Sequence, residues 1–493
     1  MTLQRGRFAI RYVATIPLVL LAGCALNRQA DTEMSAALAR YEQRAKPDAD
    51  AYSESLKPTT RPAAATSQPA SQAGSSTTEP QTLREFIVTA LAQNPEIKAA
   101  EQTARARFAR VPQVTALPDP ILSTKTLPEP IRTAEGDNFF ILGVKQKLLV
   151  PEKLDRAGRV ALQEARMALE ALQSARLRVI ADVKRAYFSL YVIDKTLEID
   201  AANQELLRGL IDAARAQVAT GRRSQDDVLR AQVELYTLES DLIDLRQRRT
   251  TVAAALNRIL NRPPATPVPE PGRFELRSVQ ARLEEMIKLA VDKNPKLERI
   301  TQQIQRDRES LRLAELAYWP DFTLGFEWIQ MDPRGAFKPP RNPQTGIRPL
   351  TPQTSEDGSD NWSITFGMNL PIWFEKIRGG IRAARSRLLA SQHEYASERN
   401  RVYFQVEDAL ARVYSQRELA ELFDGTIIPQ ARQAYEVSRS AYTSGRSDFL
   451  FVIDNWQKWL TFTIQYHRAL GELERSVADL EEALGMSLSE AGG

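Results

Sequence analysis

Residues 321–330 read DFTLGFEWIQ, and residues 361–370 read NWSITFGMNL. In both stretches large apolar side chains alternate with small or polar ones, and the apolar set is Phe322, Leu324, Phe326, Trp328, Trp362, Ile364, Phe366, Met368 and Leu370. Ten residues of such alternation are typical of a transmembrane β-strand, with lipid on one face and a wet lumen on the other. The alternative is a half-buried sheet in a soluble protein, because alternation alone does not distinguish the two.

Two weaker extended stretches precede these, ILSTKTL (121–127) and NFFILGVKQKL (138–148), with Lys145 and Lys147 on the expected lumen side. Four tryptophans lie at or near the predicted strand ends, as in the aromatic girdles of membrane barrels: Trp319, Trp328, Trp362 and Trp373. Open sheet edges are not tolerated in hydrocarbon, and a small barrel needs about eight strands. One chain offers four, so the sheet must be shared between chains.

Long helices are predicted between the strand pairs. Residues 154–220 contain no proline and carry apolar side chains at helical spacing, including Leu162, Ala165, Leu169 and Leu172. A continuous helix of this length would reach ~100 Å. Such length predicts a coiled-coil-like bundle or an α-helical barrel.

The chain repeats itself with an offset of 200 to 224 residues. The matches occur in the same order in both halves: Asn94-Pro95 with Asn294-Pro295, Pro118-Asp119 with Pro320-Asp321, Glu152-Lys153-Leu154 with Glu375-Lys376-Ile377, Gly221 with Gly445, and Val228-Leu229 with Val452-Ile453. Ordered matches of this kind predict an internal duplication. Each repeat reads as a helix, two strands and two long helical stretches.

This plan predicts six segments. They are a signal peptide over 1–23, a low-complexity tether over 24–81, the first repeat over 82–265, a Pro-rich linker over 266–277, the second repeat over 278–486 and a tail over 487–493. The tether is rich in Ala, Pro, Ser, Thr and Gln, so it cannot bury enough apolar surface to form a core. A short helix is expected within it, near Met34–Tyr41.

The N-terminal region has the layout of a secretory signal. Arg5, Arg7 and Arg11 precede a short apolar run that ends LVLLAGC (18–24), and Cys24 is the only cysteine in the chain. The run is too short for a transmembrane helix, which needs ~20 apolar residues. An ordinary signal with a chance cysteine is the alternative to an attachment site.

Leu21-Ala22-Gly23-Cys24 resembles the bacterial lipobox. The resemblance implies that Cys24 carries covalent lipid, palmitate included, and becomes the mature N-terminus. Ala25, in place of aspartate, implies delivery to the outer membrane. No other cofactor is expected.

Charge and composition argue against several other functions. Without the three signal arginines, the chain has 63 basic and 62 acidic residues, so the net charge of +4 falls to +1 and a nucleic-acid partner is not expected. The two histidines, His393 and His467, lie on helical stretches without an HExxH-type partner. We therefore expect no enzyme and no metal site.

The duplicated plan, the lipobox and the segments around Gly221 and Gly445 together resemble the TolC-type outer-membrane efflux family over residues 82–486. The resemblance implies a mainly α homotrimer, with four strands per chain giving a twelve-stranded membrane β-barrel above a long periplasmic α-helical barrel. It also implies a passive exit duct of a tripartite pump or type I secretion system, exporting small molecules, metal ions or peptides. The partners would be a periplasmic adaptor (membrane fusion) protein and an inner-membrane transporter of RND or ABC type. The alternative is a lipid-anchored periplasmic coiled-coil scaffold or adaptor.

By position, the resemblance places periplasmic tips that dock the adaptor at TGRRSQDDVL (220–229) and SGRSDFLFVI (444–453). The tip residues are Gly221, Arg222, Ser224, Gly445, Arg446 and Ser447. Glycine permits a positive φ in each turn, and Ser224 or Ser447 is expected to cap the outgoing helix, with Asp227 at its third position. The alternative is that these are only well-formed turns.

The resemblance also places an aperture beside the tips, formed by Asp454, Phe451, Tyr442 and Asp227. Three copies of Asp454 around a threefold axis would attract cations. Phe451 stands where the family has a second aspartate, and Ser447 stands where it has an arginine, a role that Arg446 could take. For Asp454 the alternative is an ordinary solvated charge on a helix face.

Overall fold

A computed structural model of the chain describes residues 26, 28–37, 39, 82–133, 136–221, 224–272, 282–332, 343–347 and 358–488. The predictions for Cys24 and Arg222, and those for most of the tether, lie outside these residues. Residues 28–37 are helical, so the short helix expected near Met34 begins earlier than predicted. Within the described part of the chain, no helix is both long enough and apolar enough to span a membrane.

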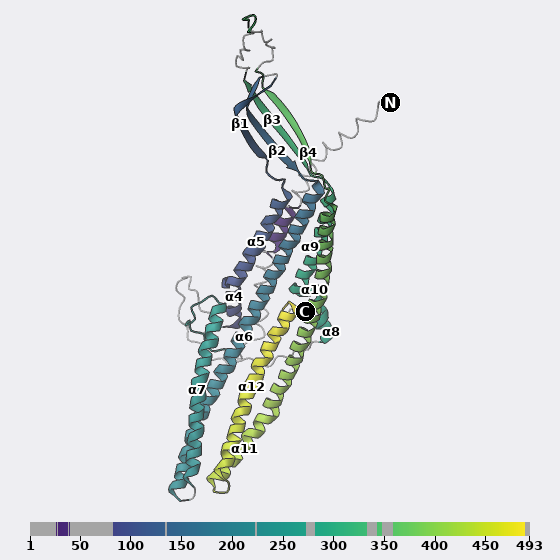
Figure 1. Cartoon of the computed structure of the whole chain (residues 1–493). Helices are drawn as coiled ribbons and strands as arrows, with labels where there is room; N and C mark the ends of the chain where they lie inside the picture. Colours follow the sequence, from purple (N-terminus) through teal and green to yellow (C-terminus); the bar gives the residue numbers. More distant parts are fainter. Residues whose placement is uncertain are drawn as a thin grey trace, which may run out of the picture. The chain divides into compact units, whose positions relative to one another are not determined.

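The same order of elements occurs twice along the sequence (Figure 1). The first series is α4 (Leu83–Gln93), α5 (Pro95–Thr115), β1 (Ile121–Arg132), β2 (Asp137–Leu148), α6 (Pro151–Ala219) and α7 (Gln225–Ile259). The second is α8 (Leu283–Lys293), α9 (Pro295–Glu315), a 3-10 turn (Leu316–Tyr318), β3 (Phe322–Asp332), β4 (Asn361–Met368), α10 (Phe374–Leu422), a π-helical turn (Phe423–Ile427), α11 (Ile428–Thr443) and α12 (Phe449–Leu484). The four predicted strands and the long helix after residue 154 are thus confirmed.

Contacts divide the chain into two units, each built from both halves of the sequence. The first comprises Met1–Met34, Arg105–Arg166 and Gln302–His393, and the second comprises Ser35–Ala104, Met167–Thr301 and Glu394–Gly493. The sheet lies in the first unit. The turns of the helical hairpins α6–α7 and α11–α12 lie in the second unit.

The four strands form one antiparallel sheet in the order β1-β2-β3-β4. Phe326 lies opposite Val144 on one side and Ile364 on the other, so the apolar positions of neighbouring strands share one face. Glu327 and Lys145 lie on the opposite face and form an ion pair of 3.0 Å. The sheet therefore has one apolar and one polar face, as the alternation predicts, and β1 and β4 are its two edges.

The repeated Asn-Pro motif closes each half of the chain onto its last helix. Asn94 donates its side-chain amide to the carbonyl of Ile259 (2.9 Å), and Asn294 donates to the carbonyl of Ala483 (2.7 Å). The side-chain oxygen of each asparagine accepts a backbone N–H from the first turn of the following helix. Each asparagine thus caps a new helix and ties it to the last turn of the repeat.

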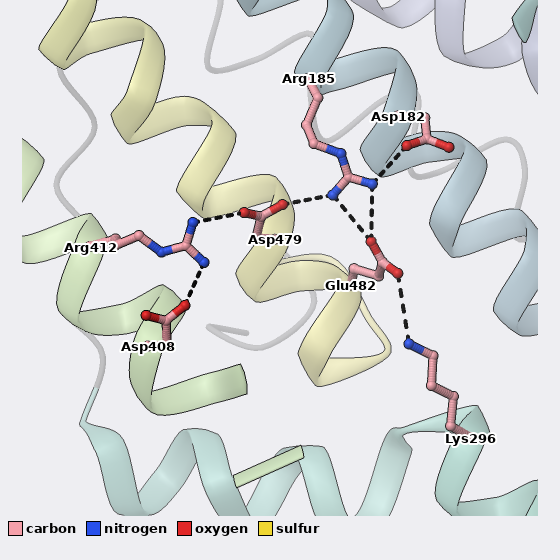
Figure 2. A network of polar contacts seen from close by, with 7 residues as sticks. All are labelled: Asp182, Arg185, Lys296, Asp408, Arg412, Asp479 and Glu482. Carbon is pink, nitrogen blue, oxygen red and sulfur yellow. Dashed lines mark hydrogen bonds and ion pairs between the residues drawn. The ribbon is translucent and has the colours of Figure 1, made fainter. Parts of the chain in front are cut away.

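Charged side chains link four helices near the end of α12. Arg185 on α6 bonds Asp182, Asp479 and Glu482, and Asp479 is shared with Arg412 on α10 (Figure 2). Arg412 also forms an ion pair with Asp408 (2.7 Å), and Lys296 on α9 forms one with Glu482 (3.8 Å). Beside this network, Lys184 and Glu481 form an ion pair whose side chains are almost fully buried. The network thus connects α6, α9, α10 and α12.

Candidate functional site

The candidate site consists of the two helix–turn–helix tips of the second unit and the residues beside them. Gly221 follows α6 with φ of 71°, and Gly445 follows α11 with φ of 74°. Each glycine N–H bonds the carbonyl three residues earlier, Val218 in the first turn and Tyr442 in the second, at 2.9 Å. Positive φ favours glycine because it lacks Cβ. The two predicted turns are therefore built alike.

The first turn starts α7 as predicted. Ser224 is the N-cap residue, its hydroxyl accepts the N–H of Asp226 (3.3 Å), and Asp227 occupies the third helical position. The cap predicted at Ser447 is wrong, since α12 begins one residue later and Asp448 is its N-cap. The sequence SGRSD offers two cap residues in a row, and the second, Asp448, occupies the N-cap position without a side-chain capping hydrogen bond.

A buried tyrosine links the two tips. The hydroxyl of Tyr442 on α11 donates to Oδ2 of Asp227 on α7 (3.2 Å), and the Tyr442 side chain is 1% exposed. Its ring lies 5.1 Å from that of Phe449 on α12. Arg446, the predicted substitute for the family arginine, instead donates its Nε–H to the hydroxyl of Ser444 within its own turn. The tyrosine and the aspartate thus form the only predicted aperture pair that the described part of one chain brings into contact.

The other two aperture residues lie on the exposed face of α12. Phe451 is 58% exposed, and Asp454 pairs with Lys458 one turn further along at 2.8 Å. A carboxylate at 51% side-chain exposure keeps most of its hydration, so this pair adds little to stability. Both side chains remain available to a neighbouring surface.

Comparison with known proteins agrees with this geometry. The family model "outer membrane efflux protein" matches residues 86–262 and 286–486. The chain belongs to this family. It is an outer membrane efflux protein, and the resemblance stated from the sequence is confirmed.

Individual relatives of this efflux protein are distant. The cobalt-zinc-cadmium resistance protein CzcC of Cupriavidus metallidurans is 20% identical over 414 residues, which cover 82% of this chain and 90% of CzcC. The solved structure of VceC from Vibrio cholerae gives a TM-score of 0.67 at 16% identity, covering 82% of this chain and 96% of VceC. The open state of the MtrE channel from Neisseria gonorrhoeae gives 0.66 at 18% identity, covering 83% and 90%. These likenesses confirm the mainly helical fold with a small sheet.

Two tryptophans of this efflux protein, whose role the sequence does not predict, make contacts between helices near the tips. The indole N–H of Trp456 on α12 donates to Oδ1 of Asn203 on α6 (2.8 Å), and Trp456 is 2% exposed. Trp459 stacks on Tyr435 of α11 with ring centroids 5.5 Å apart. Asn203 and Tyr435 escape sequence reasoning because a polar or aromatic residue in a long amphipathic helix has no local signature.

One turn before Asn203, Asp200 carries an unusual carboxylate. The side chain is buried, and its Oδ1 has no hydrogen-bond partner among the described residues. Burial and, to a smaller extent, the nearby Asp241 on α7 together raise the pKa of Asp200 to about 6, against the opposing effect of Arg468 on α12. Desolvation disfavours the charged form. The carboxylate is therefore a titratable group among three packed helices.

Proposed function

We propose that this efflux channel is the passive exit duct of a tripartite pump, assembled as a homotrimer whose twelve strands close one barrel. The observation that best supports this proposal is the exposed apolar face of the sheet. Its central side chains are about half to two-thirds exposed in one chain: Leu324 at 47%, Phe326 at 49%, Ile364 at 65%, Phe366 at 67% and Met368 at 54%. A contiguous apolar surface on this scale needs a cover, and lipid is the cover that suits a sheet with a polar opposite face.

The polar face supplies the wall of a wet duct. Gly143 and Gly325 lie on this face, where a Cβ would come within 3.1 Å of the Glu327 side chain and 3.2 Å of the Lys145 side chain, respectively. The missing Cβ atoms let the Lys145–Glu327 pair lie along the sheet. Charged groups that are paired and solvated on the lumen side avoid the cost of burial in lipid.

The tips of the helical hairpins are the proposed docking site of a periplasmic adaptor protein. Gly221, Ser224, Gly445, Arg446 and Ser447, together with Arg222 from the sequence, would present the paired turns to it. An inner-membrane transporter of RND or ABC type would supply the energy, because a duct has no energy source of its own. Phe451 and Asp454 are proposed to face the threefold axis at the aperture, with the Tyr442–Asp227 link closing it.

Covalent lipid on Cys24 is proposed as a second anchor in the outer membrane. The predicted signal and lipobox support this assignment. Small molecules, metal ions and peptides remain the proposed range of cargo.

The duct is tested by membrane extraction and bilayer recording. A Cys24→Ser variant should resist carbonate extraction from outer membranes and require detergent, because the barrel holds it there. Purified protein should give ion conductance, and Asp454→Ala should alter its magnitude or cation preference. Release of Cys24→Ser into carbonate buffer, together with absence of conductance from the wild type, would favour the periplasmic scaffold.

A further inference from the structure

The two repeats place the same pair of charged residues at the foot of the sheet. Lys153 is the third residue of α6, and Asp321 directly precedes β3. Their repeat partners are Lys376, the third residue of α10, and Asp119, which lies just before β1. Sequence position and local structure therefore agree for both members of the pair.

Within one chain the first combination forms an ion pair. Lys153 Nζ lies 2.7 Å from Oδ1 of Asp321 and also donates to the backbone carbonyl of Trp319 (2.8 Å). Both side chains are only about one-seventh exposed, at 15% and 13%. The pair forms because β2, which leads into α6, lies beside β3 in the sheet. The ion pair thus connects the start of α6, which follows β2, to the residue that precedes β3.

The second combination does not form within one chain. Lys376 follows β4 and Asp119 precedes β1, and these strands are the opposite edges of the sheet. Both residues are exposed, and neither has an ion-pair partner among the described residues. Lys376 and Asp119, which occupy the repeat positions of the paired Lys153 and Asp321, therefore lie at the two open edges of the sheet.

We propose that Lys376 of one copy pairs with Asp119 of the next copy, so that the contact between chains repeats the Lys153–Asp321 contact within a chain. This inference rests on the proposed function, because it requires the sheet to close between copies. β4 of one copy would lie beside β1 of its neighbour, as β2 lies beside β3. Among copies that share one orientation in the membrane, the opposite charges would favour this edge pairing over pairing of two identical edges, which would bring Lys376 near Lys376 or Asp119 near Asp119.

Local packing around the two lysines supports the equivalence. Leu154 and Ile377, which follow them, are 5% and 9% exposed, so both helices bury the same position. Each strand pair is also joined at its Pro-Asp segment: the side-chain amide of Gln146 donates to the carbonyl of Pro118, and the backbone N–H of Asn369 donates to the carbonyl of Asp321. Lys376 and Asp119 thus occupy local backbone positions equivalent to those of Lys153 and Asp321.

The test combines charge reversal with cross-linking in the full-length protein. Asp119→Lys and Lys376→Asp should each reduce the trimer fraction in detergent, measured by native mass, and the double reversal should restore it. Asp119→Cys with Lys376→Cys should give covalent dimers and trimers with a short bifunctional thiol reagent, which spans more than the reach of a disulfide. Each single cysteine variant should stay monomeric on a denaturing gel.

Glu375 provides the matched control, since it adjoins Lys376 and pairs within its own helix with Arg378 at 2.9 Å. Asp119→Cys with Glu375→Cys should cross-link much less. The inference is overturned if the trimer is intact but the cysteines at 119 and 376 cross-link no better than this control. It is also overturned if the double charge reversal restores no more trimer than either single variant. Neither result would contradict the proposed duct. A wild-type protein that is monomeric and non-conducting would instead remove the duct and the inference with it.

Discussion

Replacing Asp200 with asparagine tests the burial of a carboxylate between the hairpins. Asp200 is 3% exposed, and its pKa rises from the ordinary 3.8 to about 6. At ~1.36 kcal/mol per pKa unit, this difference amounts to about 3 kcal/mol against the folded state once the carboxylate is charged. Asp200→Asn removes that charge, so we expect it to stabilise the folded protein at neutral pH.

The sign follows from where the proton binds more tightly. Below pH 3.8 the group is protonated in both states and costs nothing. As pH rises from 3.8 to 6, Asp200 ionises in the unfolded chain but stays protonated in the folded one. The free energy of unfolding therefore falls through this window. Above pH 6 the full penalty applies. The advantage of Asp200→Asn should therefore grow between pH 4 and pH 6.5 and stay constant above.

Thermal unfolding followed by tryptophan fluorescence measures the effect, because Trp456 bonds Asn203 one turn from Asp200. With an unfolding entropy of ~2.1 cal/mol/K per residue, a chain of this length should gain about 3 °C in Tm at pH 7.5 and almost nothing at pH 4. Asp212→Asn, on an exposed part of the same helix, is the control and should show no such dependence. A Tm difference for Asp200→Asn that is negative, or equal at both pH values, would refute the reasoning.

Three further predictions concern the tips and the end of α12. Tyr442→Phe removes the hydroxyl that bonds Asp227, a charge-assisted contact worth ~1.5–3 kcal/mol, and should raise the open fraction in bilayer recordings; an unchanged open fraction would exclude the link from gating. Lys184→Met removes the ammonium that pairs with the buried Glu481 carboxylate and should lower the free energy of unfolding by ~3–5 kcal/mol, whereas adding Glu481→Leu should recover most of the loss in denaturant titration. Gly485→Ala places a Cβ 2.8 Å from backbone atoms at φ of 82° and should cost ~1–3 kcal/mol, seen as a lower Tm; a Tm equal to the wild type would contradict the close packing.

Local patterns in the sequence predict most of the fold. The alternation from Phe322 to Trp328 and from Trp362 to Met368 locates the sheet and its faces, because side-chain direction in a strand has a period of two. The absence of proline predicts α6, and paired glycines predict both tips. The repeat matches also align the Asn-Pro junctions, although their bonds to Ile259 and Ala483 appear only in the structure.

Long-range partners escaped prediction for a physical reason. Trp456 finds Asn203 across 253 residues, and helix periodicity says which face a side chain occupies but not what it meets there. The misplaced cap at Ser447 has a local cause, since Asp448 competes for the same role. The raised pKa of Asp200 depends on burial, which no single residue type reveals.

The Asn-Pro junctions bear on how such a chain arises. Asn94 fastens the start of the first repeat to its own last helix, and Asn294 does the same for the second. Each half therefore makes its own Asn-Pro contact. A gene for a single half would still encode this contact, and six copies of it would present the same number of strands as three copies of the present chain. Gene duplication and fusion would then change the stoichiometry of the ring without requiring a new joint.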